Sequence, residues 1–242
     1  MKILALDTTT FLGAIALVED DRLVAGIQHG TAATYSERLI AGIDYCRAAA
    51  GWTMDELDLI AVAQGPGSFT GLRIGLATAK GLAVAGKVPL KGVSSLEVLA
   101  YGVRDAVRTI VPVIDARRDE VYAAAYAAGD GSFEMPLMEV GVFPPVDLCR
   151  RLEAVAGELM LVGDGARRYR EVVLQHLGAR AHIPDDAHHF PHGLSVAALA
   201  RAAYLTQGAD DVVHLVPNYI RHSDAEIGFN NNRRSPLDAR RS

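Results

Sequence analysis

The stretch from Gln64 to Leu82, QGPGSFTGLRIGLATAKGL, constrains the fold of this chain more than any other. An apolar run ends just before it, and glycines and a proline then crowd into a few residues before a helical pattern rich in small side chains. The pattern predicts a buried strand, a tight loop and a helix. Gly65 and Gly67 permit backbone angles that other residues resist. Ser68 or Thr70 is placed to cap the helix, because a hydroxyl oxygen accepts from an unpaired first-turn N–H.

A glycine-rich loop at a helix N-terminus is a candidate phosphate cradle, and three interpretations of it remain open. A nucleotide-binding P-loop requires Gly-Lys-Ser/Thr, whereas Leu72 follows Gly71 here. A dinucleotide fingerprint requires its third glycine one place earlier than Gly71 and usually follows the first strand of its fold. The third interpretation is a turn that only links a strand to a helix.

The helix after the loop carries a stripe of small residues, Gly71, Gly75 and Ala79, which are four positions apart and share one face. Small side chains allow another helix to approach closely. We therefore predict that this face associates with another protein, and packing inside the same domain is the alternative. The predicted contact residues are Gly71, Leu72, Ile74, Gly75, Thr78, Ala79 and Leu82.

Strand and helix patterns along the chain follow one order and then partly repeat it. The first set has strands at 2–7, 13–18, 22–29, 57–63 and 88–93, with helices at 35–50, from about 70 to 86 and from about 95 to 103. This is the βββαβα order of a ribonuclease-H-like lobe. The second set has strands at 109–114, 120–127, 133–142 and 159–162, with helices at 146–155 and from about 163. A further helix is predicted at 195–205.

Composition favours a soluble globular protein. Half of the 242 residues are apolar, which is enough for a substantial core, and the net charge of −5 gives no global attraction to nucleic acid. Two cysteines, Cys46 and Cys149, are too few for a disulfide framework. No N-terminal signal and no membrane-length apolar run occur, so we expect a cytoplasmic protein without a membrane segment.

Several segments together resemble one protein family. Residues 65–82, GPGSFTGLRIGLATAKGL, are very similar to the signature of the TsaB family, also called YeaZ. Further matches fall in the family's order, and those after residue 125 are looser. They are ILALDTTT (3–10), YSERL (35–39), DLIAVAQ (58–64), PLKGVSSLEVLA (89–100), IDARRDEVYAA (114–124), LVGDGA (161–166) and PNYIR (217–221).

The resemblance implies an α/β fold of the actin-like ATPase (ASKHA) superfamily. Such a fold has two ribonuclease-H-like βββαβα lobes with mixed sheets that face each other across a cleft. We expect the first lobe to span residues 1–105 and to be completed by a returning helix at about 194–208. The second, smaller lobe is expected at 106–193. Residues 228–242, which are rich in arginine, are predicted to be a disordered tail.

The resemblance also implies a function. TsaB is a bacterial subunit of the machinery that makes threonylcarbamoyladenosine in tRNA. It is a non-catalytic partner that dimerises with the catalytic subunit TsaD and acts together with the ATPase subunit TsaE. The complex transfers a threonylcarbamoyl group to N6 of the adenosine next to the anticodon (position 37). Alone, the chain is expected to form a homodimer, and it is expected to meet tRNA only through the complex.

A nucleotide site is implied at the end of the first strand. In actin-like ATPases an aspartate at the position of Asp7 orients a hydrated magnesium ion near the phosphates. By resemblance, an active or vestigial phosphate site consists of Asp7, Thr8, Thr9, Gly65, Gly67 and Ser68. A carboxylate that caps its own turn through Thr9 is the alternative, and the two roles are compatible. No cofactor is expected, with ATP or ADP and magnesium at the cleft or at the complex interface as the alternative.

Histidines argue against a metal enzyme. His188, His189 and His192 form the only cluster, and Pro191 within it disfavours the regular helix that would bring two of them to one face. Residues 35–45, where TsaD carries its metal-binding histidine pair, contain no histidine. We therefore expect no metal site, no catalytic residue and a partner subunit rather than an enzyme. The alternatives are an ATPase or kinase active on its own, and a metalloprotease, the label once attached to the wider family.

Deleting residues 228–242 should leave the fold intact, because this segment carries almost no apolar residues to bury. We expect the melting temperature of the truncated chain to stay within a few degrees of the full-length value. About 1 kcal/mol of lost stability would shift it by roughly 2–4 °C. A larger fall in a thermal denaturation scan would contradict the prediction.

Overall fold

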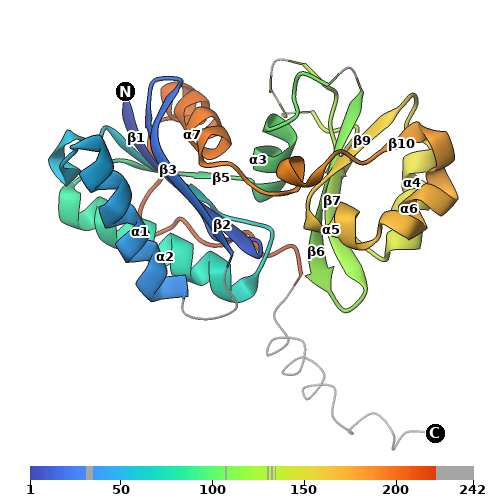
Figure 1. Cartoon of the computed structure of the whole chain (residues 1–242), viewed down its shortest axis with the longest axis horizontal. Helices are drawn as coiled ribbons and strands as arrows, with labels where there is room; N and C mark the ends of the chain where they lie inside the picture. The colour runs from blue at the N-terminus through green and yellow to red at the C-terminus, as the bar shows by residue number, and fades with distance from the viewer. Residues whose placement is uncertain (31–34, 107, 130, 132, 134, 222–242) are drawn as a thin grey trace, which may run out of the picture.

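The computed structural model describes residues 1–30, 35–106, 108–129, 131, 133 and 135–221, and it has two α/β lobes side by side (Figure 1). The sheet of the first lobe has the strand order β3-β2-β1-β4-β5. Its strands are β1 (Lys2–Asp7), β2 (Leu12–Glu19), β3 (Arg22–Gly30), β4 (Leu59–Ala63) and β5 (Leu90–Val93). The pairs β1–β2 and β2–β3 are antiparallel, whereas β1–β4 and β4–β5 are parallel, so the sheet is mixed.

The sheet of the second lobe repeats this topology. Its strands are β6 (Thr109–Arg117), β7 (Glu120–Ala125), β8 (Met138–Phe143), β9 (Leu159–Val162) and β10 (Ala181–His182). Read from β8, the order is β8-β7-β6-β9-β10, which matches the first sheet strand for strand. The predicted fold class of two mixed-sheet lobes is confirmed. Strand β10 was not predicted, because two residues are too short for an alternating pattern.

Helices cover both faces of each sheet. They are α1 (Tyr35–Ala50), α2 (Phe69–Gly86), α3 (Ser95–Tyr101), α4 (Pro145–Glu153), α5 (Asp164–Arg168), α6 (Arg170–Leu177) and α7 (Gly193–Gln207), with 3-10 turns η1 (Met54–Glu56), η2 (Gly178–Arg180) and η3 (Asp186–His189). Helices α1 and α2 pack on one face of the first sheet around Leu4 and Leu6. Helix α7 packs on the other face around Ile3 and Ala5. None of the helices in the described part of the chain combines the length and apolarity needed to cross a bilayer.

The two lobes exchange helices. Helix α3, which follows the first sheet in sequence, places Leu96 and Leu99 in an apolar cluster with Ile110 and Ile114 of the second sheet. Helix α7, which follows the second sheet, packs on the first, and α3 contacts α7 (Figure 1). Each half of the chain therefore closes the core of the other. Helix α7 occupies the place expected for the returning helix, whereas α3 lies inside the range 1–105 but contacts the second sheet, so the lobe boundaries remain a prediction.

The C-terminal end of the described chain lies near the β6–β7 hairpin of the second lobe (Figure 1). The predicted tail at 228–242 lies outside the described residues.

Candidate functional site

Asp7 ends β1 and is fully buried. Its Oδ1 accepts a hydrogen bond from the backbone N–H of Thr9 at 2.8 Å and another from the Thr9 hydroxyl at 2.7 Å. Its Oδ2 has no hydrogen-bond partner among the described residues. Burial raises the pKa of the Asp7 carboxyl to about 6, against the opposing effect of the two bonds from Thr9. Asp7 therefore caps its own turn and leaves one oxygen buried without a partner.

The glycine face of α2 packs on this turn. A Cβ atom on Gly71 would overlap the carbonyl oxygen of Thr8, and one on Gly75 would overlap the Thr8 hydroxyl. A Cβ on Gly67 would overlap the carbonyl oxygen of Thr9. The Thr8 hydroxyl also donates to the carbonyl oxygen of Gly71 at 2.7 Å. Glycine is required here because the helix crosses the turn at backbone contact.

Two backbone donors of the candidate phosphate cradle are used within the chain. The N–H of Ser68 donates to the carbonyl oxygen of Thr9 at 2.7 Å, and the N–H of Gly71 donates to Ser68 Oγ at 3.3 Å. Above the loop, the carbonyl oxygen of Asn218 lies 2.8 Å from where a Cβ on Gly65 would be. The two N–H groups of Ser68 and Gly71 are therefore not available to a phosphate. Of the predicted nucleotide residues Asp7, Thr8, Thr9, Gly65, Gly67 and Ser68, the structure links Asp7 and Ser68 to Thr9 by hydrogen bonds and packs Gly67 against Thr9. Thr8 bonds Gly71 and the carbonyl oxygen of Gly65 accepts from Ser95, both outside that set.

The predicted association face on α2 needs correction, because that face points into the chain. Gly71, Leu72, Gly75 and Ala79 are buried by the chain's own turn and core. Ile74, Thr78 and Leu82 are half-buried, and the first and last of these pack against the same core. Packing inside the domain, the alternative interpretation, accounts for the stripe.

The outward face of α2 carries mostly small and apolar residues. The exposed residues of the helix are Phe69, Thr70, Arg73, Ala77, Gly81, Val84 and Ala85. Val84 is 67% exposed, and no atom outside the local helix lies within 4 Å of where a Cβ on Gly81 would be. Sequence periodicity shows both faces but does not say which of them the sheet covers.

The histidine cluster is held by structural hydrogen bonds. His189 is buried, its Nδ1 accepts from the N–H of Gly163 at 3.1 Å, and its Nε2 lies 2.9 Å from a backbone carbonyl oxygen. In this geometry Nδ1 is an acceptor, and Nε2 faces an acceptor. The ring of His192 bonds the side chain of Gln28 at 3.2 Å, and His188 is exposed. Within the described ranges, no three His, Cys, Asp or Glu side chains are grouped so that they could hold a metal ion.

Asp115, near the end of β6, is a counterpart of Asp7, a relation that the charged pattern of residues 115–120 does not reveal. Its Oδ1 accepts from the N–H of Arg117, two residues on, as Oδ1 of Asp7 does from Thr9. The side chains of Arg117 and Arg168 pair with its Oδ2, at 3.2 Å and 2.9 Å. The repeated topology is the signal that could have found it, since the equivalent strand ends carry equivalent turns.

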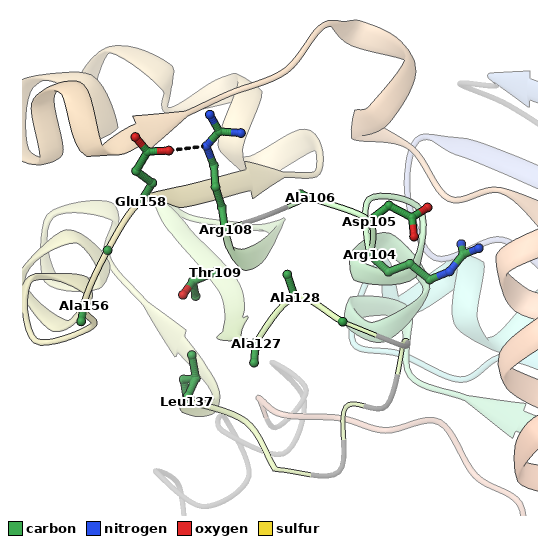
Figure 2. A pocket seen from close by; sticks show the side chains of 12 residues that line it. Arg104, Asp105, Ala106, Arg108, Thr109, Ala127, Ala128, Leu137, Ala156 and Glu158 are labelled. Atoms are coloured by element: carbon green, nitrogen blue, oxygen red, sulfur yellow. Dashed lines mark hydrogen bonds and ion pairs between the residues drawn. The ribbon is translucent and has the colours of Figure 1, made fainter.

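Two cavities lie away from Asp7 and the glycine loop, and the second of them is lined in part by His188 and His192. One, of about 650 Å³, is lined by Arg104, Thr109, Leu137 and neighbours, and an ion pair of 2.7 Å between Arg108 and Glu158 lies on its wall (Figure 2). Another, of about 660 Å³, lies against β2, β3 and the start of α7. Neither cavity is lined by a residue that the sequence analysis assigned to nucleotide binding.

The two equivalent lobes, each with a capping aspartate near the end of its first strand, give the chain the two-lobed fold of the actin-like ATPases. Solved structures of this fold include component A of the (R)-2-hydroxyglutaryl-CoA dehydratase of Acidaminococcus fermentans, with a TM-score of 0.52 at 10% identity over 85% of this chain and 99% of that one. YeaZ from Pseudomonas aeruginosa matches more fully, with a TM-score of 0.74 at 29% identity over 90% of this chain and 99% of that one.

Sequence comparison identifies the family to which the chain belongs. The model of the family TsaD, tRNA N6-adenosine threonylcarbamoyltransferase, matches residues 29–229. The tRNA threonylcarbamoyladenosine biosynthesis protein TsaB of Bacillus subtilis is 32% identical over 226 residues, which cover 93% of this chain and 96% of that protein. The Escherichia coli protein of the same name is 31% identical over 167 residues, covering 68% of this chain and 72% of that protein. The chain belongs to the TsaB family, as the resemblance indicated.

Replacing Gly71 with alanine should destabilise the fold, because the new Cβ would overlap the Thr8 carbonyl oxygen. Overpacking of this kind costs about 1–3 kcal/mol. Gly81→Ala, on the open face of the same helix, is the matched control. It should stabilise the chain by about 0.5–1 kcal/mol through helix propensity. Denaturant unfolding of both variants measures the difference, and equal effects would contradict the packing described.

Asp7→Asn should stabilise the chain increasingly as pH rises. The pKa of Asp7 in the folded chain, about 6, lies above the ordinary value of 3.8, so the folded state binds the proton more tightly than the unfolded state does. The stability that the protonated carboxyl contributes is therefore lost as pH rises from about 4 through 6. Asparagine keeps the acceptor for Thr9 and stays neutral. Its advantage over aspartate should therefore be small near pH 4 and reach up to about 3 kcal/mol by pH 7.

Unfolding curves at several pH values measure this advantage, with the exposed Asp55→Asn as the control. An advantage that did not change with pH would show that burial does not penalise the charge of Asp7.

Proposed function

We propose that this chain supports the formation of threonylcarbamoyladenosine in tRNA as a non-catalytic subunit. The observation that carries the proposal is the 32% identity to the B. subtilis protein over nearly the whole length of both chains. In this proposal the chain binds a TsaD-like catalytic subunit, a TsaE-like ATPase acts on the assembly, and tRNA is bound through the complex. The chain forms a homodimer when it is alone.

The hydrogen bonds that Ser68 and Gly71 donate within the chain support a structural rather than a catalytic role. A nucleotide-hydrolysing relative would need backbone donors aimed at phosphate, and those of Ser68 and Gly71 donate within the chain. The isolated protein should therefore neither be stabilised by MgATP nor hydrolyse it above background. ATP turnover that disappears in Asp7→Asn would instead establish an enzyme.

The outer faces of α1 and α2 are the proposed association surface. Both helices cover the same face of the first sheet. Their exposed apolar side chains include Ile40 at 45%, Tyr45 at 67% and Val84 at 67%. Exposed apolar residues on adjacent helices mark interaction surfaces more often than isolated ones do.

A partner of the same fold suits this surface. The family model of the catalytic TsaD proteins matches residues 29–229, so a TsaD-like partner shares the architecture of this chain. A face through which two copies associate about a two-fold axis can then receive a structurally similar partner in nearly the same geometry. Homodimer and heterodimer would compete for one surface.

Val84→Asp should abolish association while leaving the fold intact, because a charge would be buried between helices without a partner. The matched control is Leu205→Asp, on α7, where leucine is 71% exposed. Light scattering measures the homodimer, and co-purification measures the complex with a TsaD-like subunit. Association that survives Val84→Asp, or fails equally in Leu205→Asp, would contradict the assigned surface.

The biological role has a separate test. In a bacterium depleted of its own TsaB, this chain should restore threonylcarbamoyladenosine in tRNA, as measured by mass spectrometry of nucleosides. The Val84→Asp variant should not restore it. An unmodified tRNA pool in cells that contain the folded wild-type chain would refute the proposed function.

A further inference from the structure

Residues 208–221, which we name the C-terminal strap, follow α7 and begin along the edge of the first sheet. Asp210 donates its N–H to the carbonyl oxygen of Leu90 in β5 at 2.9 Å. Its carboxylate accepts from the N–H of Gly92 at 2.8 Å and pairs with the buried Lys91 ammonium at 2.9 Å. The strap is therefore fixed at its start to the free edge of β5.

The middle of the strap lies on α2 and on the glycine loop. Val212 and Leu215 pack against the core beneath α2. The N–H of Asn218 donates to the carbonyl oxygen of Gln64 at 2.7 Å. The ring of Tyr219 stacks on Phe69 with centroids 5.4 Å apart, and its hydroxyl accepts from Arg73 Nε at 3.0 Å.

The end of the strap binds the second lobe. The Arg221 guanidinium pairs with the Glu120 carboxylate at 2.5 Å and donates to the carbonyl oxygen of Ala116 at 2.8 Å. Ile220 packs against the apolar cluster that α3 shares with the second sheet. Arg221 and Glu120 are 24% and 32% exposed, so water screens this pair less than it screens a fully exposed one.

We propose that the C-terminal strap sets the angle between the two lobes and that Arg221 is the residue that holds it. The lobes also meet through α3 and α7, and in Figure 1 the strap crosses from one lobe to the other below these helices. Two separate connections restrain a hinge more than one does, because rotation about the α3–α7 contact must move the strap. The Arg221–Glu120 pair lies where the C-terminal strap reaches the second lobe.

Double electron–electron resonance between spin labels measures the lobe angle directly. Exposed labelling sites exist in each lobe, at Ala202 in α7 and at Gln175 in α6. The native cysteines, Cys46 and Cys149, are buried and free, so labels on Ala202→Cys and Gln175→Cys define the distance. Dilution with unlabelled chain removes distances between copies.

Arg221→Ala should shift and broaden the distance distribution, and Glu120→Gln should do so from the other lobe. Arg221→Lys keeps the charge but loses the second donor. Its distance distribution should therefore lie between those of the wild-type chain and Arg221→Ala. Arg22→Ala removes a similar arginine pair, to Glu19, wholly within the first lobe and should change nothing. Melting temperatures identify any variant that fails to fold.

A distribution unchanged in both Arg221→Ala and Glu120→Gln, each shown to be folded, would overturn the proposal. A change in Arg221→Ala that is no larger than the change in Arg22→Ala would also overturn the proposal. The measurement uses the isolated chain, so its outcome does not depend on the proposed role in tRNA modification.

Discussion

The close contact between α2 and the turn after β1 is the constraint on which the first lobe depends. Gly71 and Gly75 carry no side chain where the helix crosses Thr8, and the Thr8 hydroxyl bonds back to the helix. This contact fixes the helix on the sheet, shapes the loop before it and orients the turn that Asp7 caps. Beside this contact, the N–H groups of Ser68 and Gly71 donate within the chain, so the glycines of the helix serve packing.

Much of this organisation could be predicted from the sequence. Alternating and helical patterns predicted the main strands and helices, and the Asp7 cap followed from the Asp-Thr-Thr turn. The sequence could not show that the stripe of small residues on α2 faces the interior of the chain. Thr8, on which the stripe packs, lies 63 residues from Gly71 in sequence. Periodicity defines a face but not what covers it.

The strap was missed for a related reason. Residues 208–221 have no periodic pattern, and their order comes from separate contacts with Lys91, Gln64, Phe69 and Glu120, which lie far away in the sequence. The buried role of His189 likewise depends on Gly163, which the fold alone brings to it. Such contacts follow from tertiary structure and leave no local signal.

The exchange of helices has a consequence for synthesis on the ribosome. The face of the first sheet around Ile3 and Ala5 is covered by α7, which emerges only after almost the whole second lobe has been made. During translation that apolar face stays uncovered while more than a hundred residues are added, at roughly 5–20 residues per second. The folding of the first lobe is therefore completed only near the end of translation.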